Sequence, residues 1–223
     1  MFQNNLLMAA GKAPAVVTSA FTANDATATD LGSYTFSSQA LGTAAADRII
    51  VVGVQTHDYS NSFVSGTVAG QTLSQIATSG AGNHTLFLLQ ASVASGTSGD
   101  IFVDWSSTST NSFIGVWALY GANSTVSDTA VGTNDANPAT ANIDCPAGGT
   151  IIGMVRHYGS PSHQHTHTWT NLTEDFDVYQ EYASVSGAHD NFTAAQSGLT
   201  ISAQKSGGGT HQSRFCLASY GPA

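Results

Sequence analysis

The histidines of the segment SHQHTHTW alternate along the chain. On a β-strand, His163, His165 and His167 would share one face, with successive members about 6.6 Å apart. Two such imidazoles can chelate one transition metal. In a trimer with these strands on its threefold axis, the histidine rows of the three copies would converge on one ion. The sequence therefore predicts a metal site at these residues, with His157 nearby. The alternative is a solvated row of histidines that become charged below about pH 6.5.

Three carboxylates follow in the segment LTEDFDVY. Glu174, Asp175 and Asp177 stand close together and offer the oxygen ligands that calcium prefers. A glycosidase also uses two carboxylates, but that pair is defined by its separation across a cleft and not by closeness in sequence. Such a segment is equally typical of a solvated turn between strands, and we expect a turn here.

Motifs of the common enzyme classes are absent from the sequence. It contains no GxSxG elbow, no Walker loop, no HExxH and no CxxC pair, and no spacing of Ser and His selects a catalytic triad. We therefore expect a protein that is not an enzyme. Trp105, Trp117 and Trp169 would make a sugar-binding platform if they were exposed, although the strand alternation around Trp105 and Trp117 favours the core.

The chain carries little charge, and its net charge is negative. Of its 223 residues, 9% are charged, against about 25% in an ordinary soluble domain. Five Lys and Arg residues stand against fourteen Asp and Glu residues, giving a net charge of −9. Nucleic acids and anionic membrane surfaces both attract basic patches, so we expect neither as a partner. Low charge suits a protein that packs against other copies in an assembly.

Runs of β-branched and aromatic residues, bounded by Gly, Asn, Ser or Pro, predict an all-β protein. No segment shows a sustained helical period. The run RIIVVGV is apolar on both faces, so we place its strand in the centre of a sheet. The clearest predicted strands are 48–57, 84–93, 100–105, 113–120 and 150–157, and weaker ones are 33–37, 71–76, 166–171, 178–185, 199–204 and 214–220.

The chain resembles itself weakly over residues 48–121 and 150–221. RIIVVGV is echoed by TIIGMV, and ALYG at the end of the first half by ASYG at the end of the second. In this alignment Cys216 takes the place of Val116, which predicts a small buried side chain. Cys145 and Cys216 are enough for one disulfide, but we expect both to be unpaired. Residues between the halves, 122–149, are interpreted as a polar crossover.

Each half offers about five strands, and a single sheet would leave an apolar face uncovered. Two sheets packed face to face bury each other. We therefore predict one β-sandwich over residues 15–223, with jelly-roll-like connections and two pseudo-repeated halves. The alternative is two small sandwiches in tandem.

The opening segment MFQNNLLMAAGKAPAVV holds an apolar cluster of Phe2, Leu6, Leu7 and Met8. No basic residue precedes it, so it does not have the pattern of a secretory signal. It is also shorter than the roughly 20 residues that span a bilayer. We therefore interpret residues 1–14 as an extended arm that docks on a partner protein through these four side chains.

The segment FQNNLLMAA resembles the start of many small structural proteins of tailed bacteriophages. The body is similar to phage proteins of one β-rich family, through RIIVVGV, VAGQTL, LQASVASGTSGDIFVDW, GVWALYG and TWTNLTEDFD. The resemblance implies a non-enzymatic virion protein, either a capsid-decoration protein or a tail or fibre component. It implies other virion proteins as partners and a homo-oligomer, with a trimer as one form. The alternatives are a receptor- or glycan-binding adhesion module of the virion, and a hydrolase.

Overall fold

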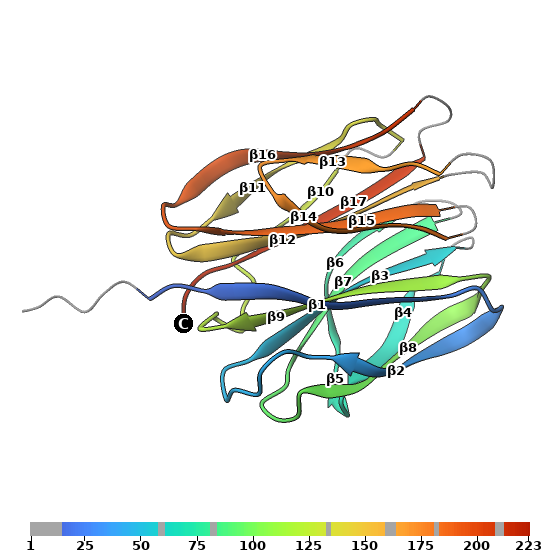
Figure 1. Cartoon of the computed structure of the whole chain (residues 1–223), viewed down its shortest axis with the longest axis horizontal. Helices are drawn as coiled ribbons and strands as arrows, with labels where there is room; N and C mark the ends of the chain where they lie inside the picture. The colour runs from blue at the N-terminus through green and yellow to red at the C-terminus, as the bar shows by residue number, and fades with distance from the viewer. Residues whose placement is uncertain are drawn as a thin grey trace, which may run out of the picture.

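The structure is a computed structural model that describes residues 15–57, 61–80, 84–132, 135–158, 164–180, 183–207 and 212–223. Within these ranges the regular elements are β-strands, with no helix, and all paired strands are antiparallel. The prediction of an all-β protein is confirmed. The strands form four sheets, two from each half of the chain (Figure 1).

Two five-stranded sheets occupy the middle of the molecule, and we call them the inner sheets. The first has the order β1-β9-β3-β7-β6 and the second the order β10-β17-β12-β15-β14. The first consists of β1 (Thr18–Thr27), β3 (Ile49–His57), β6 (Ser74–Gly80), β7 (His84–Ser92) and β9 (Ser112–Tyr120). The second consists of β10 (Asp128–Val131), β12 (Gly149–Tyr158), β14 (Thr173–Gln180), β15 (Ala183–Phe192) and β17 (Ser213–Tyr220).

An outer sheet covers each inner sheet on the side that faces away from the other half. The first outer sheet has the order β2-β8-β4-β5, and the second has the order β11-β16-β13. The first consists of β2 (Leu31–Ala40), β4 (Phe63–Val68), β5 (Gln71–Thr72) and β8 (Ser98–Ser109). The second consists of β11 (Ala139–Cys145), β13 (His167–Thr170) and β16 (Gln196–Lys205).

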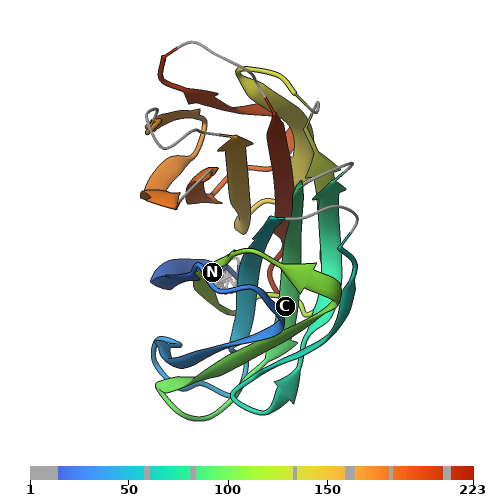
Figure 2. The ribbon, with the colours of Figure 1, turned by 90° about the vertical axis from the view of Figure 1, so that its right-hand side faces the viewer.

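Three apolar cores hold the four sheets together. One lies between the inner and outer sheets of each half, and the third lies between the two inner sheets. Figure 2 shows the second half, in yellow to red, above the first half, in blue to green. Representative members are Val52 and Val103 for the first half, Ile151 and Trp169 for the second, and Trp117 and Met154 for the core between the halves.

The strands in the middle of the inner sheets are covered on both faces. Nearly every residue of β3, β9, β12 and β17 is buried. A strand with two buried faces needs a continuous apolar run, because an alternating pattern would bury polar side chains. The central placement predicted for the strand at 48–57 is confirmed.

The number of sheets differs from the sequence prediction. We expected each half to contribute one sheet to a single sandwich. Each half instead folds into an inner and an outer sheet, and the two inner sheets pack against each other. The predicted single sandwich describes the packing of the two inner sheets against each other. The alternative of two tandem sandwiches describes the packing of an inner sheet against an outer sheet within each half.

Two local predictions are wrong. The interpretation of 122–149 as a crossover misses β10 and β11. β10 is short and only partly buried, and a short strand of this kind can have the composition of a loop. The predicted strand 178–185 covers the end of β14 and the start of β15, which pair with each other as a hairpin. No Gly, Pro or Asn separates these two strands, so the usual turn signal is missing from the sequence.

The two cysteines are free, as predicted, and both are buried, which the sequence had predicted only for Cys216. The predicted match of Cys216 with Val116 pairs two side chains that face different cores. Val116 faces the core of its own half, whereas Cys216 faces the core between the halves and its neighbour Leu217 faces the core of the second half. Neighbouring residues of a strand point to opposite faces of the sheet, so Leu217 rather than Cys216 faces the core of its own half, as Val116 does.

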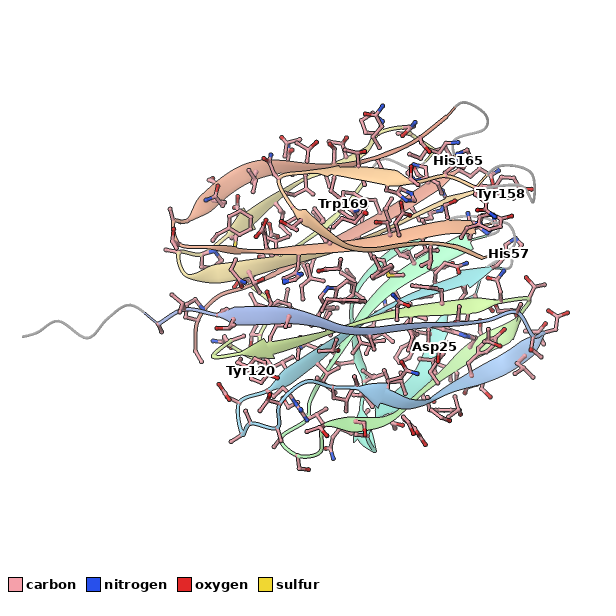
Figure 3. The ribbon with its side chains drawn as sticks, viewed as in Figure 1. Asp25, His57, Tyr120, Tyr158, His165 and Trp169 are labelled. Atoms are coloured by element: carbon pink, nitrogen blue, oxygen red, sulfur yellow. The ribbon has the colours of Figure 1, made fainter. Side chains whose placement is uncertain are left out.

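The strands of the inner sheets begin and end at two opposite ends of the molecule. β3 begins beside the end of β9, which is Tyr120, and we call this the Tyr120 end. β3 finishes at His57, beside the start of β7, and we call this the His57 end. Thr18 pairs with Tyr120, so β1 begins at the Tyr120 end. The backbone N–H of Ala223 donates to the carbonyl of Gly121 at the same end, over 2.9 Å. Figure 3 labels Tyr120 and His57 at these opposite ends.

Aromatic rings fill the core between the halves. The ring of Phe176 on β14 lies 5.3 Å from that of Phe21 and 5.9 Å from that of Trp117, measured between centroids. Gly115 and Gly187 leave the space that this ring occupies. A Cβ at Gly187 would lie 2.6 Å from Phe176 Cζ and 2.7 Å from Trp117 Cζ2.

A buried arginine fixes the segment that leads into β3. The side chain of Arg48 has no solvent exposure, and all three of its guanidinium nitrogens donate to backbone carbonyls. These bonds tie the segment before β3 to the segment after β7. The acceptors, at 2.8–3.1 Å, are Leu41, Gly42, Val93, Ser95 and Gly96.

Candidate functional site

Five of the described histidines gather at the His57 end. His57 closes β3, His84 opens β7 and His157 lies near the end of β12. His165 and His167 come just before and at the start of β13. Figure 3 shows His57, Tyr158 and His165 together at this end. They form two groups, one between the halves and one inside the second half.

The first group lies between the two inner sheets. The rings of His57 and His84 stack with centroids 4.6 Å apart, and the ring of Tyr158 lies 5.9 Å from that of His84. The guanidinium carbon of Arg156 is 5.9 Å from the Tyr158 ring centroid. Arg214 Nε donates to the carbonyl of His84 over 3.2 Å. The group therefore joins strands of both halves at this end.

Positive charge dominates this first group. Burial, together with the charges of Arg156, His57 and Arg214, lowers the pKa of His84 to about 2. Burial and the nearby Arg214 lower the pKa of Arg156 to about 9. Arg214 also forms an ion pair with the exposed Asp135, at 3.0 Å. Chemically, the group favours anionic neighbours and keeps His84 uncharged at neutral pH.

His57 also contacts a hydroxyl group. Thr110 Oγ1 lies 2.8 Å from His57 Nδ1 and donates to the backbone carbonyl of His57 over 3.0 Å. The backbone N–H of Thr110 donates to the same carbonyl over 3.1 Å. These contacts fix the His57 ring at the junction of β3 with the β8–β9 turn.

The second group lies between the inner and outer sheets of the second half. His157 Nδ1 is 3.1 Å from His167 Nε2, and His167 Nδ1 is 2.9 Å from Asp177 Oδ1. The backbone N–H of His167 donates to Asp177 Oδ2 over 2.6 Å. On the same face as His167, His165 Nε2 lies 3.4 Å from Lys205 Nζ. Side chains from β12, β13, β14 and β16 thus meet at this point.

Burial sets the protonation of the second group. Burial, together with the charge of the neighbouring His167, lowers the pKa of His157 to about 3. Burial also lowers the pKa of Lys205. The pKa of Glu174 is raised, first by burial and then by the nearby Asp177. His157 is therefore a neutral imidazole at neutral pH.

The predicted metal site is only partly within the described residues. His163 lies outside them. His165 and His167 point to the same buried face, as the alternation predicts, but they contact different partners. In the described part of the chain, no group of three or more His, Cys, Asp or Glu residues is placed to hold a metal ion. The three-histidine site stays a prediction.

The three carboxylates do not form a solvated turn. Glu174, Asp175 and Asp177 lie on β14, and each has a different partner. Glu174 Oε2 accepts from Ser186 Oγ over 3.3 Å, and Asp177 binds His167. The expectation of a turn is wrong, because β14 carries a bulge here that directs neighbouring side chains to different contacts.

Asp175 links the two halves of the chain. Its Oδ2 accepts from Trp117 Nε1 over 2.8 Å, and its Oδ1 lies 2.7 Å from His189 Nδ1. Burial acts to lower the pKa of His189, but the hydrogen bond and charge of Asp175 outweigh it and the pKa is raised. The acidic segment therefore stabilises the packing between the sheets.

The tryptophans do not form a surface platform. Trp105, Trp117 and Trp169 are exposed by only 4%, 0% and 9%. The core positions expected for Trp105 and Trp117 are confirmed. A sugar-binding surface built on these three rings is therefore excluded.

The predicted docking residues Phe2, Leu6, Leu7 and Met8 lie outside the described residues. The described chain starts at the Tyr120 end, where the backbone N–H of Val17 donates to the carbonyl of Gly148 over 2.7 Å. A surface cavity of about 340 Å³ lies at the same end, lined by residues that include Ile49, Ser92 and Ala223.

The sequence interpretation did not select the group between the halves. His57, His84, Arg156 and Arg214 are far apart in sequence and fit no motif. Each stands at the end of an apolar run, as in VQTH, HTLFL, MVRH and SRFCL. An imidazole or guanidinium at the end of a strand that is buried on both faces was the signal that could have found them.

No family model, no curated protein sequence and no solved structure matches this chain. The resemblance to phage virion proteins thus stays a prediction. Within the described residues, no helix is long and apolar enough to cross a membrane.

Proposed function

We propose that this chain is a non-enzymatic structural protein of a phage virion. In this proposal, residues 1–14 dock the protein on other virion proteins, as a capsid-decoration protein or a tail or fibre component. The observation that carries the proposal is that the start of the described chain and the histidine groups lie at opposite ends of the body. The described chain begins at the Tyr120 end, opposite the end where the histidine groups lie. An arm attached there would hold the body with its His57 end directed away from the attachment site.

The described residues form three apolar cores among themselves. Val17 is buried in the core between the halves, while its neighbour Val16 is 55% exposed. This supports a separate role for Phe2, Leu6, Leu7 and Met8, which is contact with a partner.

The energetics of such an arm favour several copies. Burial of four apolar side chains contributes roughly 1.5–3 kcal/mol each. Ordering about ten flexible residues costs on the order of 1–2 kcal/mol per residue. These terms nearly cancel, so one arm alone would bind weakly. Several arms bound to one assembly would attach firmly through their raised effective concentration. This is our reason for a homo-oligomer, of which a trimer is one form.

The finer architecture belongs to the same proposal. We take the two halves as pseudo-repeats with jelly-roll-like connections, a fold type common in viral capsid proteins. The strand orders support this, because β1-β9-β3-β7-β6 corresponds strand for strand to β10-β17-β12-β15-β14. The outer strands β2-β8-β4 correspond in the same way to β11-β16-β13. The repeated unit would then cover 18–120 and 128–220, which extends the repeat predicted from the sequence.

Deletion of residues 1–11 tests the proposal. We expect the truncated protein to keep its β-sheet circular dichroism and its melting temperature, and to be lost from particles assembled with the other virion proteins. Leu6→Ser with Leu7→Ser should have the same effect. Asn4→Ser with Asn5→Ser is the matched control and should be incorporated normally. Normal incorporation of the deletion variant would contradict docking, and its unfolding would place the apolar cluster in the protein's own core.

A further inference from the structure

We propose that His157 and His167 form a binding site for one transition-metal ion of the zinc class, held between His157 Nδ1 and His167 Nε2. The two ligands come from strands of different sheets, β12 and β13. This site differs from the predicted row of His163, His165 and His167, because it pairs His167 with a histidine from another strand. It does not depend on the proposed role in a virion.

The separation of the two nitrogens suits a shared ion. His157 Nδ1 and His167 Nε2 lie 3.1 Å apart. Two imidazole nitrogens, each about 2.0–2.1 Å from a tetrahedral zinc ion, stand roughly 3.3–3.4 Å apart. A movement of a few tenths of an ångström brings both rings to that geometry. Both side chains are buried, so their rotamers are held by the packing around them.

The tautomers of the two rings follow from the contacts of their outer nitrogens, which are His167 Nδ1 and His157 Nε2 and face away from the other ring; the inner nitrogens are the two that face each other. His167 Nδ1 lies 2.9 Å from Asp177 Oδ1, and His157 Nε2 lies 3.4 Å from the backbone carbonyl of Ala136. A carboxylate and a carbonyl only accept, so both contacts are hydrogen bonds when each outer nitrogen carries the N–H, and we assign the tautomers in this way. In two neutral imidazoles this leaves a lone pair on each inner nitrogen. Two lone pairs that face each other repel unless a cation lies between them.

That cation is either a metal ion or a shared proton. The outer contacts match those of metal-bound histidines, whose second N–H is usually donated to a carboxylate or a backbone carbonyl. Asp177 is itself fixed by the backbone N–H of His167, at 2.6 Å. This second contact orients the carboxylate before any ion binds. We therefore favour the metal ion, and the shared proton is the outcome that would overturn the proposal.

The charges around the site are balanced. The carboxylates of Asp177 and Glu174 act on His167, and the cations Lys205 and Arg156 act on His157. A bound cation therefore meets no excess of positive charge. The described residues supply no third His, Cys, Asp or Glu ligand, so these two imidazoles are the protein ligands of the proposed site.

Cobalt titration of the full chain tests the site. After dialysis against a chelator, we expect one equivalent of Co²⁺ to give visible absorption bands, which one equivalent of Zn²⁺ then removes. Zn²⁺ should also raise the melting temperature, since a ligand that binds only the folded state stabilises it. His157→Gln should abolish both effects. His165→Gln is the matched control and should keep them, because His165 shares the face of His167 but is not a ligand.

Two results would overturn the proposal. One is a wild-type protein that takes up no metal and whose ring ¹⁵N shifts show one imidazolium shared by His157 and His167. The other is metal binding that survives His157→Gln and is lost in His165→Gln. If His157→Gln does not fold, Co²⁺-induced shifts of the ring signals in the wild-type protein decide instead. They should appear at His157 and His167, and their absence there contradicts the site.

Discussion

Replacing Gly187 with alanine tests whether the two halves pack as one body. Gly187 lies on β15, and its missing side chain makes room for the ring of Phe176 in the core between the inner sheets. A Cβ would lie 2.6 Å from Phe176 Cζ and 2.7 Å from Trp117 Cζ2, both closer than carbon atoms can approach. The ring cannot move away freely, because Phe21 and Phe113 each lie 5.3 Å from it, measured between centroids. We therefore expect a clear loss of stability.

The magnitude follows from the cost of overpacking, which is typically 1–3 kcal/mol. Because several rings confine Phe176, we expect about 2–3 kcal/mol for Gly187→Ala. One kcal/mol lowers the melting temperature of a chain of this size by roughly 2–4 °C, so the expected shift is roughly 4–12 °C. Urea unfolding followed by tryptophan fluorescence measures the loss. Gly32→Ala is the control, because a Cβ at Gly32 meets no atom within 4 Å.

A second substitution identifies the cause. Phe176→Leu removes the ring that the new Cβ would strike, although it destabilises the protein by itself. In that background, Gly187→Ala should cost less than in the wild-type protein, by on the order of 1–2 kcal/mol. If Gly187→Ala costs the same in both backgrounds, the clash with Phe176 is not the cause. If it costs nothing in the wild-type protein, the packing between the inner sheets is not as described.

Two further predictions concern buried polar groups. Arg48→Lys should lower the free energy of unfolding, measured in urea, by about 2–4 kcal/mol. An ammonium has three donors for the five carbonyls that the guanidinium binds, so at least two carbonyls lose their partner. A loss below about 1 kcal/mol would contradict this prediction. Stability should also fall as the pH drops from about 6.5 towards 3. The pKa values of buried His84 and His157 lie below the unfolded value, so protons bind first to the unfolded chain, with a slope of up to about 1.4 kcal/mol per pH unit for each histidine. His84→Gln should make this slope shallower in melts across the same range, and an unchanged slope would exclude His84 as a source.

Most of the strands that the sequence predicted clearly have two buried faces, and the half-buried β8 was recognised by its alternation. β3, β9 and β12 are continuous apolar runs, and such runs need no knowledge of their neighbours to be recognised. β1 and β10 are partly exposed at sheet edges, and their polar residues resemble a loop. The four-sheet arrangement was not predicted, because the outer strands other than β8 are individually weak in pattern and their pairing partners are distant in sequence.

The histidine sites show the same limit. Alternation placed His165 and His167 on one face, which the burial pattern bears out. It could not name His157 and Asp177 as the partners of His167, because those contacts depend on which strands become neighbours. The cluster of His57 and His84 with the arginines has no local signature at all, since it forms only when the two halves meet.

The two inner sheets limit where this protein can change in evolution. A substitution on β3, β9, β12 or β17 meets a packed core on one side or the other, so these strands offer almost no position that is free to vary. A charged residue there would be costly on either face. Diversity among variants of the protein should therefore concentrate on the solvent faces of the two outer sheets and on the connections at the strand ends.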